Sequence, residues 1–121
     1  MDILLIEDDV GLAELITANL EELRFSVMRT ASGVETFAHL EKLTPDLMLL
    51  DYSLPDINGK ELIETLIKRQ MSAPPFIITT GQGDERIAVD MMKLGAMDYL
   101  VKDILFLEKL PDLVKRVVKE I

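Results

Sequence analysis

The stretch LMLLDYSLPDING, residues 47–59, decides the fold. Four apolar residues lead directly into Asp51, and Pro55 and Gly59 then favour a change of chain direction. A continuous apolar run bounded by turn residues is typical of a strand that is buried on both faces of a parallel sheet. Asp51 is therefore predicted just beyond the carboxyl end of a central strand, which is the edge where open parallel sheets bind ligands.

The same patterns predict five strands that alternate with five helices along the whole chain. Apolar runs bounded by turn residues indicate the strands, and apolar residues at helical spacing indicate the helices. The strands are expected at residues 2–6, 25–30, 47–50, 76–79 and 97–101. The helices are expected at residues 10–23, after Ser32, from about Gly59, at 84–94 and at the end of the chain.

Strict alternation of strands and helices implies an α/β fold, with a parallel sheet covered by helices on both faces. The runs at 2–6, 47–50 and 76–79 are continuously apolar and so are expected in the middle of the sheet, whereas the other two are mixed and are expected at its edges. These assignments predict a single doubly wound five-stranded parallel sheet of order 2-1-3-4-5, the flavodoxin-like arrangement. Residues 1–121 are expected to form one domain.

Three local patterns give more detailed expectations. Ser32 followed by Glu35 has the spacing of a capping box at the start of the second helix. Pro111 is expected in the first turn of the fifth helix, because proline is poorly tolerated deeper inside a helix. The inward face of the second helix is predicted to comprise Val34, Phe37, Ala38 and Leu40.

The composition excludes several classes of function. The chain has 22 acidic and 13 basic residues and a formal net charge of −9, so direct binding of nucleic acid is not expected. No apolar stretch approaches the roughly 20 residues of a membrane helix, and no secretory signal is expected. There is no cysteine, which excludes disulfides and thiolate metal sites, and a cytoplasmic location is expected.

The predicted strand order brings several polar side chains to one edge of the sheet. Glu7 and Asp8 follow the first strand, beside Asp51, while Thr80 and Lys102 follow the fourth and fifth strands. Each residue alone could be a helix cap, a turn residue or a solvated charge, but their convergence favours a shared site. Crowded carboxylates need a cation, and oxygen ligands favour Mg²⁺. A carboxylate beside Mg²⁺ can attack phosphorus, and a hydroxyl and an ammonium can bind the phosphoryl oxygens.

The chain resembles a receiver domain of the two-component response regulators from Ile3 to about Val118. The residues that carry the resemblance are Glu7, Asp8, Asp51, Pro55, Gly59, Thr80, Gly81, Tyr99 and Lys102. The resemblance implies that Asp51 accepts a phosphoryl group from a histidine kinase or a histidine phosphotransfer domain. It implies no enzymatic activity beyond self-phosphorylation and self-dephosphorylation.

The resemblance also implies a role for each of the other site residues. Asp8, Asp51 and the backbone carbonyl of Ser53 would bind Mg²⁺, and Glu7 would assist through a bound water. Thr80 and Lys102 would bind phosphoryl oxygens.

Further implied roles concern signalling. Thr80 would move with the phosphoryl group, and Tyr99 would be a rotamer switch on the face formed by the fourth helix, the fifth strand and the fifth helix. Ser53 and Gln82 would tune the lifetime of the phosphoryl group. The switched face would serve a homodimer or a covalently attached output domain, and the chain is either a stand-alone receiver or part of a larger regulator.

One residue departs from the family pattern. The family usually has proline directly after the lysine, whereas Asp103 follows Lys102 here. A cis peptide bond without proline is not expected. Asp103 either adds a negative charge near the pocket or caps the segment that follows.

Other functions remain as alternatives. A phosphatase of the haloacid dehalogenase type needs a second Asp two residues after the nucleophile, and Ser53 occupies that position. A flavodoxin would need a phosphate-binding loop after the first strand, where residues 7–9 are acidic instead. A receiver-like adaptor that is not phosphorylated is the third alternative.

Overall fold

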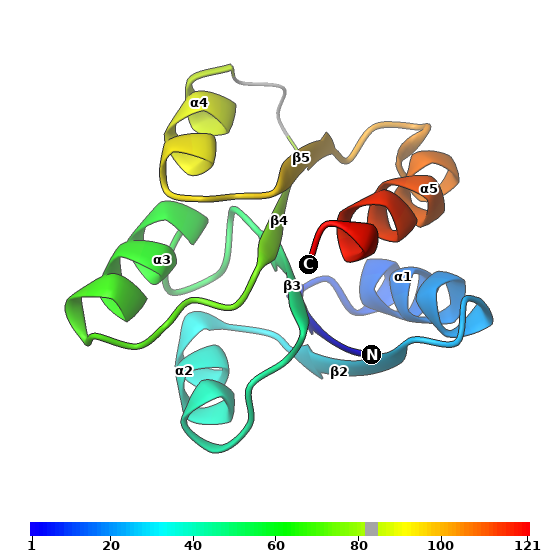
Figure 1. Ribbon diagram of the computed structural model, residues 1–121. Coiled ribbons are helices and arrows are strands. Elements are labelled where there is room, and N and C mark those ends of the chain that lie inside the picture. The colour runs from blue at the N-terminus through cyan, green and yellow to red at the C-terminus, as the bar shows by residue number, and fades with distance from the viewer. Residues whose placement is uncertain (82–84) are drawn as a thin grey trace.

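The computed structural model of the protein describes residues 1–81 and 85–121. A parallel sheet of five strands lies between two layers of helices (Figure 1). The strands are β1 (Asp2–Ile6), β2 (Ser26–Thr30), β3 (Leu47–Asp51), β4 (Phe76–Thr80) and β5 (Asp98–Val101). They pair in the order β2-β1-β3-β4-β5, so the predicted fold class and topology are confirmed.

Five helices connect and follow the strands. They are α1 (Val10–Glu22), α2 (Gly33–Lys42), α3 (Gly59–Lys68), α4 (Glu85–Lys93) and α5 (Phe106–Lys119). Helices α1 and α5 cover one face of the sheet, and α2, α3 and α4 cover the other (Figure 1). The predicted start of the fourth helix at Asp84 lies outside the described residues. None of the helices in the described ranges has the length and apolar character needed to cross a membrane.

The sheet separates two hydrophobic cores, because successive strand residues point to opposite faces. In β1, Ile3 and Leu5 pack towards α1 and α5, whereas Leu4 and Ile6 pack towards α3 and α4. Strands β3 and β4 are buried along their whole length, and β2 and β5 are largely half-buried or exposed. The prediction of central and edge strands from apolar runs is therefore confirmed.

The strand register aligns the carboxyl ends of the central strands. Ile6 is paired with Leu50, and Asp51 is paired with Thr79. Thr80 is paired with Val101 at the end of β5. The last residue of β4 and the residues directly after β1 and β5 therefore lie at the same edge as Asp51.

The start of α2 is as predicted, but its buried face is not. The Ser32 hydroxyl accepts the backbone N–H of Glu35 at 3.1 Å, which confirms the N-terminal cap. Val34, by contrast, is 71% exposed and Ala38 is also exposed, so half of the predicted face was wrong. Thr36 is buried instead, because its hydroxyl lies 2.8 Å from the Thr30 hydroxyl and has no need of water.

The position of Pro111 also differs from the prediction. Helix α5 begins at Phe106, so Pro111 lies beyond the first turn and provides no N–H for the carbonyl of Leu107. The side-chain amide of Asn19, on α1, donates to this carbonyl at 3.3 Å. A contact between helices thus replaces the hydrogen bond that proline removes.

Candidate functional site

Asp51 is the last residue of β3 and is only 4% exposed. Its Oδ1 accepts the backbone N–H of Ser53 at 3.2 Å, and its Oδ2 lies 3.1 Å from the Nζ of Lys102. Burial raises the pKa of Asp51 above its ordinary value, and the positive charge of Lys102 acts in the opposite direction. The contacts with Ser53 and Lys102 thus fix the orientation of the Asp51 carboxylate.

Glu7 follows β1 and is the most buried carboxylate of the site, at 1% exposure. Its Oε1 lies 2.5 Å from Lys102 Nζ, and its Oε2 accepts the backbone N–H of Asp9 at 3.2 Å. Burial raises the pKa of Glu7, the hydrogen bond from Lys102 opposes this rise, and the negative charge of Asp51 adds to it. Lys102 therefore bridges two buried carboxylates, in agreement with its predicted place at this edge.

The acidic groups are close enough to share a cation. Glu7, Asp8 and Asp51 each offer one carboxylate oxygen, and these oxygens all lie within 4.8 Å of one another. Glu7 and Asp51 share the ammonium of Lys102, and Asp8 is exposed, which leaves one side of the group open to solvent. Hard oxygen donors in this number fit Mg²⁺. The three carboxylates of the predicted donor set are therefore brought together.

Thr80 and Lys102 lie beside Asp51, as the strand order requires. The two residues are held together by the backbone N–H of Lys102, which donates to the carbonyl of Thr80 at 2.7 Å. They line a cavity of about 460 Å³ whose wall also includes Asp51 and Ser53. A hydroxyl-bearing residue, an ammonium and a carboxylate thus border one space. Gln82, a predicted neighbour of this space, lies outside the described residues.

The loop after Asp51 is closed by backbone hydrogen bonds. The N–H of Gly59 donates to the carbonyl of Tyr52 at 2.7 Å, and a β-bridge pairs Ser53 with Asn58. Ser53 is exposed, and its backbone N–H is the donor to Asp51. The backbone of Ser53 is consequently well fixed, while its carbonyl as a metal ligand stays a prediction.

Asp56 fastens the same loop to a distant helix. Its carboxylate accepts the backbone N–H groups of Gly33 at 2.8 Å and Val34 at 3.0 Å, which lie at the start of α2. These two hydrogen bonds lower the pKa of Asp56. A Cβ on Gly33 would come within 2.4 Å of the Cγ2 of Ile57, so only glycine permits this close approach. The loop beside the site is therefore anchored to α2.

Asp103, which stands where the family usually has proline, caps the following segment. Its Oδ1 accepts the backbone N–H of Leu105 at 3.0 Å, and its carbonyl accepts that of Phe106 at 3.1 Å. The cap, one of the two alternatives, is thus the observed role. As expected, none of the described peptide bonds is cis.

Arg29 is a site residue that sequence reasoning missed. Its Nε donates to the carbonyl of Glu7 at 2.9 Å, and its Nη2 donates to the carbonyl of Asp8 at 3.2 Å. The sequence contains a signal for this contact, because the strand order 2-1-3 places the end of β2 beside Glu7 and Asp8. In the sequence, a single arginine in a strand of mixed polarity indicates only an edge strand.

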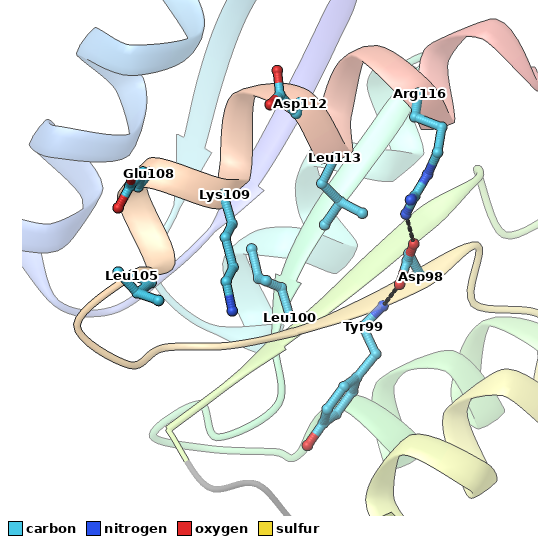
Figure 2. A pocket seen from close by; sticks show the side chains of 9 residues that line it. All are labelled: Asp98, Tyr99, Leu100, Leu105, Glu108, Lys109, Asp112, Leu113 and Arg116. Carbon is cyan, nitrogen blue, oxygen red and sulfur yellow. Dashed lines mark hydrogen bonds and ion pairs between the residues drawn. The ribbon is translucent and has the colours of Figure 1, made fainter.

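Tyr99 lies on β5, on the opposite side of the strand from α5. Figure 2 shows its ring pointing away from the side chains of α5, and it packs against the core that includes α3 and α4. The neighbouring Asp98 points to α5, where it pairs with Arg116 (Figure 2). A cavity of about 720 Å³ lies between β5 and α5. Rotation of Tyr99 as a switch stays a prediction.

Comparisons with known proteins agree with this geometry. A family model described as the response regulator receiver domain matches residues 3–117. The phosphate regulon transcriptional regulatory protein PhoB of Rhizobium meliloti is 37% identical over 101 residues, which cover 83% of this chain and 44% of that protein. The regulatory protein VanRc of Enterococcus gallinarum is 33% identical over 100 residues, which cover 83% of this chain and 42% of that protein.

Two solved structures are similar over nearly the whole chain. The non-phosphorylated HemR receiver domain from Leptospira biflexa is 31% identical with a TM-score of 0.86, and the match covers 97% of this chain and 93% of that one. The BeF3-activated receiver domain of Klebsiella pneumoniae RstA is 26% identical with a TM-score of 0.82, covering 97% and 98%. The chain spans less than half the length of the two curated relatives above.

Proposed function

Because the chain belongs to the response regulator receiver domain family of two-component systems, we propose that Asp51 accepts a phosphoryl group from a histidine kinase or a histidine phosphotransfer domain. The observation that carries this proposal is the position of Asp51, buried between Lys102 and the acidic pair at the open end of the sheet. The site residues of the proposal are Glu7, Asp8, Asp51, Ser53, Thr80 and Lys102.

The chemistry is transfer of a phosphoryl group between two side chains. A carboxylate oxygen of Asp51 forms a bond to phosphorus while the bond from phosphorus to the donor's imidazole nitrogen breaks, and that nitrogen keeps the electron pair. Mg²⁺, held by Asp8, Asp51 and the Ser53 carbonyl with help from Glu7, would neutralise the charge on the transferring group. Lys102 and the Thr80 hydroxyl then bind phosphoryl oxygens, since both residues border the same cavity as Asp51.

Receiver domains are not enzymes in the usual sense, and we propose that self-phosphorylation and self-dephosphorylation are the only reactions of this chain. Ser53 stands where a haloacid dehalogenase phosphatase needs its second Asp, and its exposed side chain offers no carboxyl group for acid–base catalysis. The intact acidic, Thr and Lys set also speaks against an adaptor that is never phosphorylated.

We propose that the outcome of phosphorylation is read at the surface around β5 and α5. This surface contains the cavity of about 720 Å³ that Figure 2 displays, bordered by Tyr99 and by charged side chains of α5. It would serve a second copy of the chain or an attached output domain in the cytoplasm. Direct binding of nucleic acid by this domain is not part of the proposal, because its net charge is −9.

The first test is the intact mass of the protein after incubation with acetyl phosphate and Mg²⁺. The native chain should gain about 80 Da, the mass of one phosphoryl group, and Asp51→Asn should gain nothing. Omitting Mg²⁺ should abolish the gain, and an established receiver labelled in parallel confirms that the donor is active. A folded native chain that gains no mass would favour the adaptor instead.

A further inference from the structure

The two peptide planes that flank Asp8 are both held by Arg29. The carbonyl of Glu7 belongs to the peptide group before Asp8, and the carbonyl of Asp8 belongs to the one after it. Arg29 donates Nε–H to the first at 2.9 Å and Nη2–H to the second at 3.2 Å. Since peptide groups are planar, fixing both of them fixes the backbone angles of Asp8 and hence the direction of its side chain.

Among the described residues, the peptide plane after Asp8 has one other contact, the N–H of Asp9, which donates to Glu7 Oε2 at 3.2 Å. Both carbonyls that flank Asp8 are bonded by Arg29. Glu7 is anchored by β2, because its N–H donates to the carbonyl of Thr30 at 3.0 Å. Asp9 is anchored by α1, because its carboxylate caps the helix by accepting the N–H of Leu12 at 2.9 Å. Asp8 lies between these anchors and is itself exposed. In the described part of the chain, its carbonyl is held by Arg29.

We propose that Arg29 is a positioning residue that presents the Asp8 carboxylate to the divalent cation. This role rests on the proposed function, because it needs the cation site formed by Glu7, Asp8 and Asp51. A guanidinium suits the task because its donors lie in one rigid plane and can bond to two successive carbonyls. A lysine offers a single nitrogen on a flexible stem and cannot reproduce that geometry.

A simple charge effect of Arg29 predicts the opposite sign. A positive charge near the site repels the cation, so its removal would raise the affinity, and only modestly, because Arg29 is exposed and screened at about 0.15 M salt. Positioning predicts that the affinity falls. The two explanations also differ for Arg29→Lys, which keeps the charge and loses the paired hydrogen bonds.

The test measures cation affinity without any phosphoryl donor. Binding of Mn²⁺ is followed by electron paramagnetic resonance of the free ion, and binding of Mg²⁺ is followed by competition. We expect Arg29→Met and Arg29→Lys to weaken Mn²⁺ binding by about tenfold, as loss of a group that orients a metal ligand does. The matched control is Lys42→Met, which removes a positive charge at the far end of α2 and should change the affinity by less than about twofold.

A double mutant separates positioning from a general structural effect. If Arg29 acts through Asp8, Arg29→Met should change Mn²⁺ affinity by less than about twofold in the Asp8→Asn background. A full tenfold loss in that background, or tighter binding by Arg29→Met, overturns the role. Equal Mn²⁺ affinities of the native chain and both Arg29 variants would overturn the positioning role of Arg29 but not the proposed function. A native chain that binds no cation would overturn both. Circular dichroism verifies that each variant is folded.

Discussion

Replacing Lys102 by Met should destabilise the fold by about 3 kcal/mol at neutral pH without Mg²⁺, the lower end of the cost of breaking a buried ion pair. The Nζ of Lys102 lies 2.5 Å from Glu7 and 3.1 Å from Asp51, whose side chains are 2% and 6% exposed. Its removal leaves two buried carboxylates facing each other. The lower end applies because the lysine side chain retains 14% exposure and some solvation. Met preserves most of the aliphatic stem.

The loss should depend on pH in a defined direction. The ordinary pKa values of Glu7 and Asp51 are 4.5 and 3.8, and burial raises both in the folded protein. The two groups therefore keep their protons to a higher pH in the folded protein than in the unfolded chain. Stability therefore falls as the pH rises through the range between the ordinary and the raised values. Lys102 opposes both pKa shifts, so stability falls further with rising pH when Lys102 is absent. The difference between native and variant proteins should be larger at about pH 7 than at about pH 5.

Urea unfolding followed by far-ultraviolet circular dichroism measures this difference. Lys109→Met, the same change at an exposed position of α5, serves as the control and should shift the unfolding free energy by less than about 0.5 kcal/mol. Mg²⁺ should reduce the difference in unfolding free energy between the Lys102 variant and the native chain, because it replaces the missing positive charge. A variant as stable as the native chain, or an equal loss at both pH values, would refute the reasoning.

Three further changes test the contacts that support the fold. Asn19→Ala should cost about 1 kcal/mol in urea unfolding, and less in a Pro111→Ala background, where a backbone N–H becomes available to the same carbonyl. Asp56→Asn should cost about 0.5–1 kcal/mol at neutral pH, since it removes a charge from a helix N-terminus. Because the pKa of Asp56 is lowered from 3.8, its contribution exists above that value and disappears as the pH falls through the lowered pKa, so the two unfolding curves should converge in acid. Gly33→Ala should cost about 1–3 kcal/mol, through overlap of the new Cβ with Ile57, and an unchanged melting temperature would contradict the close approach of these two residues.

The sheet could be predicted because its signals are local and repeated. The buried positions of strands β1, β3 and β4 are apolar apart from Asp51, Thr79 and Thr80, and strict alternation with helices leaves few topologies. The site followed from the same pattern. Once Asp51 stands at the end of a central strand, the strand order alone brings Glu7 and Lys102 beside it, and the structure confirms both positions.

The contacts that could not be predicted join a side chain to a distant backbone group. Arg29 bonds to carbonyls 22 and 21 residues earlier in the chain, and Asp56 bonds to N–H groups 23 and 22 residues earlier. Such bonds leave no periodic trace in the sequence. Pro111 shows the same limit, because the carbonyl that it leaves without a helical N–H is bonded by Asn19 of another helix. Local propensity is overridden here by a partner that only the tertiary structure supplies.

The two sides of the site are held by different kinds of contact, and this difference favours one direction for a signal. On the side of β2 and α2, Arg29 and Asp56 bond to backbone groups, and phosphorylation of Asp51 would leave these bonds unchanged. On the side of β5, the ammonium of Lys102 is held by ion pairs with Glu7 and Asp51, and a phosphoryl group would compete for the same ammonium. A ligand shifts a conformational equilibrium only through contacts that differ between the two states. We therefore infer that phosphorylation alters the β5 side, where Lys102 follows Tyr99 in the chain by three residues, and leaves the β2 side fixed.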